Sequence, residues 1–564
     1  MSLPVLNLPK ISHFRLIRLP GRFALRQLQK WGKHLADLPV EERIGPCMKR
    51  LIRMNSMHYS VQTRLNLLGA LQLIIHDSFK SEKRLIRQSR SQAKGSKPAI
   101  QRLDKLYAEL ANGYKLLIHS ISKHKQLSDH DALLIQEAIY FALKFIARRL
   151  LLAYAQYQPV SKGLWRELNQ IYRYADDQSL LFHIIDDPMS DSSFPVFHSG
   201  DLIYKRIILV ALAEPYRLMH DECLELYNLA SRWTSACSLF PISKVSTQGE
   251  HLVDLADDLA PRFVTTDLSW QPMDGRVIDI TEVIQRVESD LRGLLHNDPL
   301  ASDFELLDLE ERQKRDMLLR VVNTYQGKPI RRSKRFALGE TIEFTTTINA
   351  CHHALLKGQD FTPEMDELKY LSTSKSHTSA DDTQDFGQRY QQALNKSRRF
   401  KSGNHTLYNA AQLNINPLGL ALEYKNQQGM KISVGELIAY RFKNKKHPRW
   451  QLGSACWMKH VDETICRFGV INLANNAIPV AVKSTSSSQR NPEYLRAMLI
   501  PQHVSHQQVR SLILPSLSFD INSELILNMK RSLMTVRLSR MLNSTHSFSQ
   551  FEFEVLKQPI DISL

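Results

Sequence analysis

Residues 407–425, "LYNAAQLNINPLGLALEYK", contain two strand-like runs that meet at an Asn-Pro-Leu-Gly corner. Proline and glycine commonly mark the point where a strand stops and the chain turns. Further runs of the same kind follow: "ELIAYRF", "WQLGSACWMKHV", "TICRFGVINL" and "AIPVAVKS". Many short strands at this spacing predict a small barrel or sandwich.

The β-like pattern extends in both directions from this stretch. Upstream, "TIEFTTTIN" alternates and is rich in β-branched residues, and downstream the last eighty residues contain runs such as "SLILPSL" and "FSQFEFEVL". A tract at about 372–406 is polar and almost free of large aliphatic residues, which predicts a long loop or insertion. We expect a barrel over residues 328–484 that carries this insertion. Residues 485–564 form either a further small β-domain or an extension of the first, and we take them as a separate domain.

The first 327 residues have a helical pattern instead. Residues 1–38 read as a basic lead that ends in a short helix, and residues 39–240 place apolar residues three and four apart with charges between them. Residues 241–327 are a mixed segment that ends in long helices. The predicted fold class is multidomain α + β, with an all-α N-terminal module. A length of 564 residues also favours several domains, because single cores stop growing well below that size.

The chain has a formal net charge of +17, and much of the excess is N-terminal. Residues 1–100 contain 19 Lys and Arg against 5 Asp and Glu. Such a surface could attract nucleic acid, acidic lipid or an acidic partner protein. The alternative is a basic helical surface that binds nothing.

Nothing in the sequence indicates export or a membrane span. The N-terminus lacks an apolar core followed by a small-residue cleavage site, and the most apolar stretch, residues 138–155, is interrupted by Lys144, Arg148 and Arg149. We therefore expect a cytoplasmic protein without a transmembrane segment. The six cysteines form no CxxC pair, which argues against zinc or disulfides. "CHH" at 351–353 is better interpreted as part of a short helix packed on the barrel than as a metal site.

The stretch "RRSKRF", residues 331–336, concentrates positive charge between the helical and β-like parts. Arg331 and Arg335 are four residues apart, so in a loop that enters a strand both guanidinium groups can face one ligand. Guanidinium binds phosphate oxygens in a planar fork and also hydrogen-bonds to a guanine edge. The alternative is a basic linker between domains that binds nothing specific.

A second candidate group follows in "LNINPLGLALEY", residues 413–424. Asn414 and Asn416 are two residues apart, so their side chains share a face of an extended strand. Amides both donate and accept hydrogen bonds, which suits them to reading base edges. Gly419 stands where the backbone must turn or admit a close neighbour. The alternative is a strand-to-turn corner without a ligand.

Together these residues resemble the PilZ domain, a family of bacterial cyclic di-GMP receptors. The family pattern is RxxxR leading into a six-stranded antiparallel β-barrel, followed by D/NxSxxG at a strand edge. Arg331 and Arg335 match the two arginines, Asn414 the first position of the second motif, and Gly419 its glycine. Asn416 replaces the family's serine. The resemblance covers about residues 328–484 and implies that the arginines wrap a dinucleotide while the second motif contacts a guanine.

The resemblance predicts a cyclic di-GMP receptor without catalytic activity. Its site would contain Arg331, Arg335, Asn414, Asn416 and Gly419, with Arg332 as a further contact, and it would need no metal or other cofactor. Ligand binding would rearrange the helical and barrel domains and so signal to an unidentified protein partner. The family implies control of motility, pili or biofilm.

Two alternatives to the receptor remain open from the sequence. The chain could be a basic nucleic-acid-binding protein, or a scaffold whose PilZ-like domain no longer binds a ligand. An enzyme is disfavoured because the sequence contains no GxxxxGK[ST], GxSxG or HExxH motif.

Overall fold

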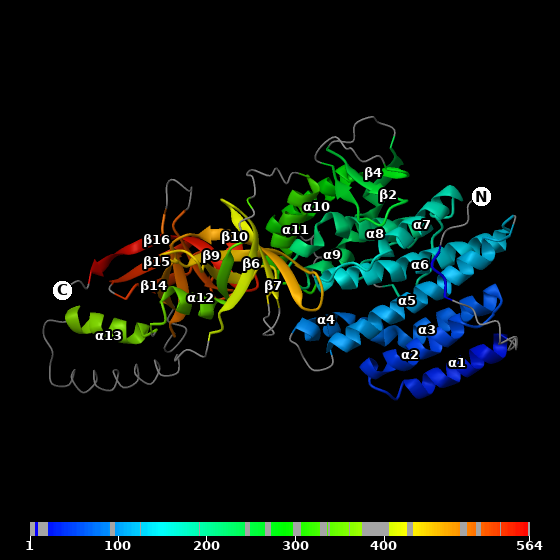
Figure 1. Cartoon of the computed structure of the whole chain (residues 1–564), viewed down its shortest axis with the longest axis horizontal. Coiled ribbons are helices and arrows are strands. Elements are labelled where there is room, and N and C mark those ends of the chain that lie inside the picture. Colours follow the sequence, from blue (N-terminus) through cyan, green and yellow to red (C-terminus); the bar gives the residue numbers. More distant parts are fainter. Residues whose placement is uncertain are drawn as a thin grey trace. The chain divides into compact units, whose positions relative to one another are not determined.

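The chain forms two compact units in a computed structural model, Met1–Ile330 and Arg331–Leu564 (Figure 1). The structure describes residues 6–9, 21–90, 96–124, 126–190, 192–242, 249–264, 272–296, 306–327, 336, 339–359, 361–374, 405–425, 432–485, 493–502, 509–530 and 532–561.

The first unit is mainly helical. Its helices are α1 Gly21–Leu35, α2 Val40–Asn55, α3 Val61–Lys80, α4 Glu82–Arg90, α5 Ser96–Ile121, α6 Asp129–Ala155, α7 Leu164–Asp177, α8 Gly200–Leu212, α9 Glu222–Ala230, α10 Thr281–His296 and α11 Glu311–Tyr325. Most residues of α6 are buried, and α6 packs against α5, α7, α8 and α9. A helix that is apolar nearly all round belongs in the interior, which explains its central place.

The basic residues that interrupt the apolar pattern of α6 are each paired inside the unit. The pairs are Lys144 with Asp187, Arg148 with Glu82, and Arg149 with Asp104. The hydroxyl of Tyr140 also donates to Asp187, at 2.7 Å. Buried charges persist only where such partners satisfy them. Over the described part of the chain, no helix is long and apolar enough to cross a membrane.

The expected mixed segment contains a small antiparallel sheet followed by α10 and α11. The strands are β1 Ser238–Pro241, β2 His251–Asp254, β3 Arg262–Phe263 and β4 Gly275–Asp279, in the order β1-β4-β2-β3. Val283 of α10 and Met317 and Leu318 of α11 are fully buried in the same core as the earlier helices. Residues 241–327 therefore belong to the helical unit and are not a separate domain.

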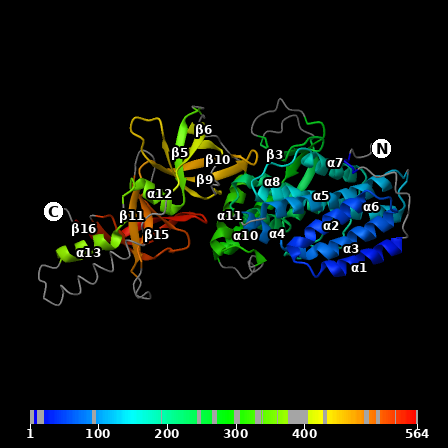
Figure 2. The ribbon, with the colours of Figure 1, turned by 60° about the horizontal axis from the view of Figure 1, so that its bottom comes forward.

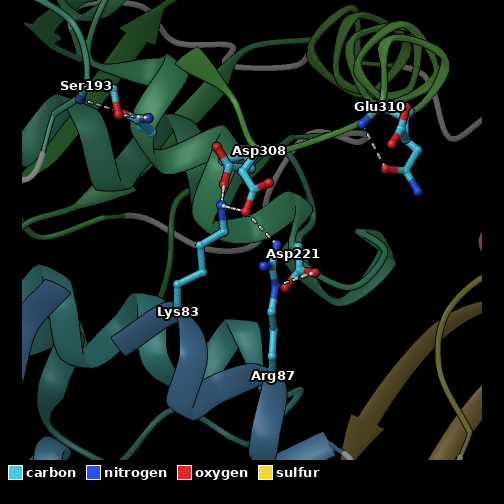
Figure 3. Close-up of polar contacts among 9 residues, drawn as sticks. Lys83, Arg87, Ser193, Asp221, Asp308 and Glu310 are labelled. Carbon is cyan, nitrogen blue, oxygen red and sulfur yellow. Dashed lines mark hydrogen bonds and ion pairs between the residues drawn. The ribbon is translucent and has the colours of Figure 1, made fainter. Parts of the chain in front are cut away.

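Helix α11 is fixed to this unit at both ends, and Figure 3 shows the contacts at the end where it begins. Just before it, the carboxylate of Asp308 lies 2.9 Å from both Lys83 and Arg87 of α4. Glu310 then forms a capping box on the first turn, which satisfies backbone donors that a helix start leaves open. At the other end the buried Tyr325 hydroxyl donates 2.8 Å to a backbone carbonyl of α8. The helix that precedes the arginine-rich stretch is thus firmly anchored.

The second unit begins with a closed six-stranded barrel, as predicted. Its strands are β5 Thr341–Thr346, β6 Tyr408–Asn416, β7 Gly419–Lys425, β8 Leu437–Phe442, β9 Gln451–His460 and β10 Ile465–Ala474, in the order β10-β7-β6-β5-β8-β9. All pairings are antiparallel. Phe344 lies inside, with its ring 5.6 Å from that of Phe468 and 5.8 Å from that of Tyr424. Residues 375–404 of the expected insertion lie outside the described residues.

A second closed barrel follows. Its strands are β11 Ile478–Ser484, β12 Leu495–Ile500, β13 Ser511–Pro515, β14 Glu524–Asn528, β15 Ser532–Ser544 and β16 Phe548–Asp561, in the order β11-β12-β13-β16-β15-β14. The prediction that the first barrel extends to residue 484 is wrong, because β11 pairs with β12 and β14. A strand pattern shows that a segment is extended but not which sheet it joins.

Helix α12, Ile348–Leu355, packs against both barrels, and α13, Pro363–Ser374, follows it. Cys351 of α12 is buried in one apolar cluster with Leu437 of β8 and Met498 of β12. Nε2 of the buried His352 lies 3.1 Å from the carbonyl oxygen of Val480. The predicted short helix at "CHH" is confirmed, and it also joins the two barrels.

Candidate ligand site on the first barrel

The hairpin of β6 and β7 turns through Pro417 and Leu418, and Asn416 pairs with Gly419 across the turn. Oδ1 of Asn416 accepts a hydrogen bond from the backbone N–H of Leu418 at 3.0 Å. Asparagine side chains stabilise tight turns in this way, and serine hydroxyls do the same more weakly. Asparagine at this position therefore performs a turn-forming role that is also open to serine.

Asn414 and Asn416 lie on one face of β6. Asn414 pairs with Ala421, and Asn416 with Gly419. Paired residues of antiparallel strands point to the same side, and neighbours along a strand alternate. Tyr424 of β7 packs on Phe344 inside the barrel, so Leu420, four residues before it on the same face, also points inward and the two asparagines face outward. The predicted sharing of one face by their side chains is observed.

The backbone of Phe336 forms an isolated antiparallel bridge with Ile415, the residue between the two asparagines. Phe336 N donates to Ile415 O at 3.0 Å, and Ile415 N donates to Phe336 O at 2.9 Å. Phe336 is the last residue of "RRSKRF", so the arginine-rich stretch ends beside the asparagines. Arg331, Arg332 and Arg335 themselves lie outside the described residues.

Gly419 is required by the close approach of β7 and β10. A Cβ on Gly419 would collide with the carbonyl oxygen of Val470 and would lie 3.1 Å from Cα of Ile471. Both are backbone atoms, which cannot move aside as the end of a side chain can. Strand packing therefore requires glycine at position 419, whether or not a ligand binds there.

Trp457 extends this face across the barrel. Ala421 pairs with Gly469 of β10, and Gly469 pairs with Trp457 of β9. The indole Nε1 of Trp457 occupies the space into which a Cβ on Gly469 would project. Asn414, Ala421, Gly469 and Trp457 thus form one row over four strands, with the two small residues in the middle. Sequence reasoning did not assign Trp457 to the site, although a glycine inside the strand pattern "TICRFGVINL" signals such a close contact.

The neighbouring row on the same face contains Glu423, Arg467 and Lys459, and one of its two cations is paired with the glutamate. Arg467 of β10 donates from Nε to Glu423 of β7 at 2.8 Å. Because Arg467 is engaged by Glu423, further cations would help to bind a ligand that carries phosphates, and the arginine-rich stretch ends beside β6 of this face. Among the described residues, no group of three or more His, Cys, Asp and Glu side chains is arranged to hold a metal ion.

Three family models match the chain in succession. Residues 26–243 match "Cyclic-di-GMP receptor FimW, N-terminal domain", residues 364–479 match "Cyclic-di-GMP receptor FimW, middle PilZ domain", and residues 480–556 match "FimW C-terminal beta-barrel domain". The chain thus contains a PilZ domain. The resemblance predicted from the sequence is confirmed. The change of model after residue 479 also agrees with the assignment of β11 to the second barrel.

A curated relative matches nearly the whole chain. The cyclic-di-GMP receptor FimW of Pseudomonas aeruginosa strain PAO1 is 21% identical over 577 aligned residues, which cover 94% of this chain and 90% of the relative. No solved structure gives a significant match. The match to the PilZ model starts at residue 364, so Arg331 and Arg335 precede it.

Proposed function

We propose that this PilZ protein is a cytoplasmic receptor for cyclic di-GMP. Cyclic di-GMP is named in the description of the curated relative and in the descriptions of two of the matching family models. The activity we assign is binding and not catalysis, with no metal or other cofactor. The proposed contacts are Arg331, Arg335, Asn414, Asn416 and Gly419, with Arg332 as a further one.

The observation that carries this proposal is the pairing of Phe336 with Ile415. It fixes the residue next to Arg335 between the two asparagines of the β6–β7 hairpin. Guanidinium groups suit the two phosphates of a cyclic dinucleotide, and amides suit the guanine edges. The arginines on one side of the Phe336–Ile415 bridge are thus candidates to bind the phosphates, and the asparagines on the other side are candidates to bind the guanines.

The hairpin residues have separate roles in this proposal. Since Oδ1 of Asn416 is used in the turn, its Nδ2 group remains to donate to the acceptors O6 or N7 of guanine. The half-buried indole of Trp457, in the row of Asn414, offers an aromatic surface on which a base can stack. Gly419 contributes by keeping β7 and β10 close.

Signal transmission would use the chain between the two units. Residues 328–335 join α11, which is anchored in the helical unit, to Phe336, which is paired to the barrel. A ligand that holds this stretch in one arrangement would bias the units toward one relative arrangement, because it binds that state more tightly. We propose that a protein partner recognises this change, with motility, pili or biofilm as the process controlled.

Calorimetric titration of the full chain with cyclic di-GMP tests the receptor assignment. We expect binding in the micromolar range or tighter, and its loss in an Arg331→Ala, Arg335→Ala double variant. A matched control is Lys446→Ala, Arg449→Ala, which removes two exposed cations from the loop between β8 and β9. The control should bind like wild type.

Three results would contradict this proposal. Equal losses in both double variants would mean that general positive charge attracts the ligand. No binding by wild type, in calorimetry and in a second optical method, would favour the scaffold. Binding to nucleic acid that falls steeply with salt, without any response to cyclic di-GMP, would favour the nucleic-acid-binding alternative.

A further inference from the structure

Helix α1 carries a continuous basic stripe on its outer face. Arg22, Arg26, Lys30 and Lys33 are all exposed, and none forms an ion pair with another described residue. At 3.6 residues per turn these four positions fall within an arc of about 80°. The helix has no acidic residue. The stripe is therefore a straight row of cations without internal compensation.

The opposite face of α1 is buried, which fixes the direction of the stripe. Ala24, Leu28 and Leu35 belong to the core of the helical unit. Gly32 lets the helix approach α3 closely, because a Cβ there would lie 2.6 Å from Cδ1 of Ile74. The helix cannot rotate its apolar side outward without losing this core packing. It therefore presents its basic side to whatever binds there.

Because α1 lies at the outer edge of the helical unit, its basic stripe is accessible to a large binding partner with a flat surface. The helix packs on α3 and lies at the outer edge of the helical unit in both views (Figures 1 and 2). The aromatic side chain of Phe23 is 49% exposed beside Arg22. A row of cations along the crest of an outer helix can touch a flat surface with all its members at once.

The sequence around α1 strengthens this charge asymmetry. Residues 1–36 contain seven Lys and Arg and no Asp or Glu; the first acidic residue is Asp37. Exposed aromatic residues among cations are typical of proteins that lie at the boundary between lipid headgroups and water. Nucleic acid would be attracted by the same charge, but Phe23 has no role in a contact with a phosphate backbone.

We propose that the basic stripe of α1 docks the helical unit on an anionic lipid surface. The headgroup phosphates would bind Arg22, Arg26, Lys30 and Lys33, and Phe23 would enter the headgroup layer. This surface belongs to the helical unit and uses none of the residues assigned to cyclic di-GMP. Failure of either proposal therefore leaves the other standing.

Vesicle flotation of the full chain tests the docking surface. We expect the protein to float with vesicles of phosphatidylcholine and phosphatidylglycerol but not with phosphatidylcholine alone. Each cation near an anionic surface strengthens binding roughly fivefold. The double variant Arg26→Glu, Lys30→Glu should therefore bind the anionic vesicles at least about 25-fold more weakly than wild type. Raising NaCl to about 1 M, where the Debye length falls to about 3 Å, should release the wild-type protein.

The matched control is Lys446→Glu, Arg449→Glu, which makes the same charge change on the barrel and should float like wild type. Equal loss in both variants, or no binding of wild type to anionic vesicles, would overturn the proposal. So would tighter binding of wild type to duplex DNA than to these vesicles in the same buffer. If the Arg26→Glu, Lys30→Glu variant does not fold, the double variant Arg22→Gln, Lys33→Gln tests the same loss of vesicle binding with a smaller change of charge.

Discussion

Phe336 and Ile415 exchange two backbone hydrogen bonds, at 3.0 and 2.9 Å, although they are far apart in the sequence. The pair ties the last residue of the arginine-rich stretch to the strand position between Asn414 and Asn416. In our account this is the joint at which phosphate-binding and base-reading groups come together.

Phe336→Pro should weaken cyclic di-GMP binding, because proline has no N–H to donate to Ile415. Loss of one such bond costs about 1 kcal/mol, so the dissociation constant should rise about fivefold to tenfold. Phe336→Ala is the control, since the bonds are made by the backbone and the side chain is 59% exposed. Equal affinities of the two variants in calorimetry would show that the bridge does not position the ligand site.

Gly419→Ala should destabilise the first barrel with or without ligand. The added methyl would collide with the backbone of β10, and overpacking of this kind typically costs about 1–3 kcal/mol. Gly69→Ala in the interior of α3 is the comparison, because nothing lies within 4 Å of a Cβ there. It should raise stability by about 0.5–1 kcal/mol. A melting temperature of Gly419→Ala equal to that of wild type would contradict the assigned strand packing.

Trp457→Ala should reduce the affinity for cyclic di-GMP, while Trp457→Phe should retain part of it. Stacking of a base on an aromatic side chain contributes about 1–3 kcal/mol, which corresponds to a loss of roughly five- to 150-fold in the alanine variant. Trp450→Phe is the control, because Trp450 stacks with Arg441 at 4.5 Å and is not in the proposed site. Unchanged affinity of Trp457→Ala would remove this residue from the site.

Acid should weaken the second unit through His352 of α12. Burial lowers the pKa of His352 to about 3 from its usual 6.5, against the opposing effect of the Val480 carbonyl. The folded imidazole therefore stays neutral, whereas the unfolded chain takes up a proton below pH 6.5. The contribution to stability is complete above pH 6.5 and is lost as the pH falls toward 3, by about 1.4 kcal/mol per pH unit.

His352→Gln removes this titration, so comparison of the two proteins isolates it. Between pH 6.5 and 4.5 the unfolding free energy of wild type should fall by about 2–3 kcal/mol more than that of the variant, measured by urea unfolding of the full chain. Parallel pH profiles of wild type and His352→Gln would show that this histidine is solvated in the folded protein.

Residue patterns were sufficient to predict local structure and a small β-domain, and the resemblance to PilZ domains added that this domain is a six-stranded barrel. Alternation and turn residues located β6, β7 and their corner at Pro417, because these signals depend only on neighbouring residues. The basic residues Lys144, Arg148 and Arg149 argued from the sequence against a membrane span, but their partners, such as Asp187 for Lys144, required the fold. Local sequence patterns do not show which residues far apart in the chain form such ion pairs.

Three features of the candidate region could not be predicted for the same reason. The bridge of Phe336 to Ile415 depends on which segments meet, and the placement of Trp457 over Gly469 depends on the register of β9 and β10. The run "AIPVAVKS" was correctly read as a strand, yet it joins the second barrel. In each case the residue pattern predicts a strand, but the segment with which that strand pairs depends on the tertiary structure.

Hydrogen–deuterium exchange of the full chain with and without cyclic di-GMP tests most directly whether the arginine-rich stretch and the hairpin form one site. We predict that the ligand slows exchange in peptides that cover residues 331–336 and in peptides that cover residues 414–419, and that both effects vanish together in the Arg331→Ala, Arg335→Ala variant. Protection of only one of these segments, or protection confined to the helical unit, would contradict the account.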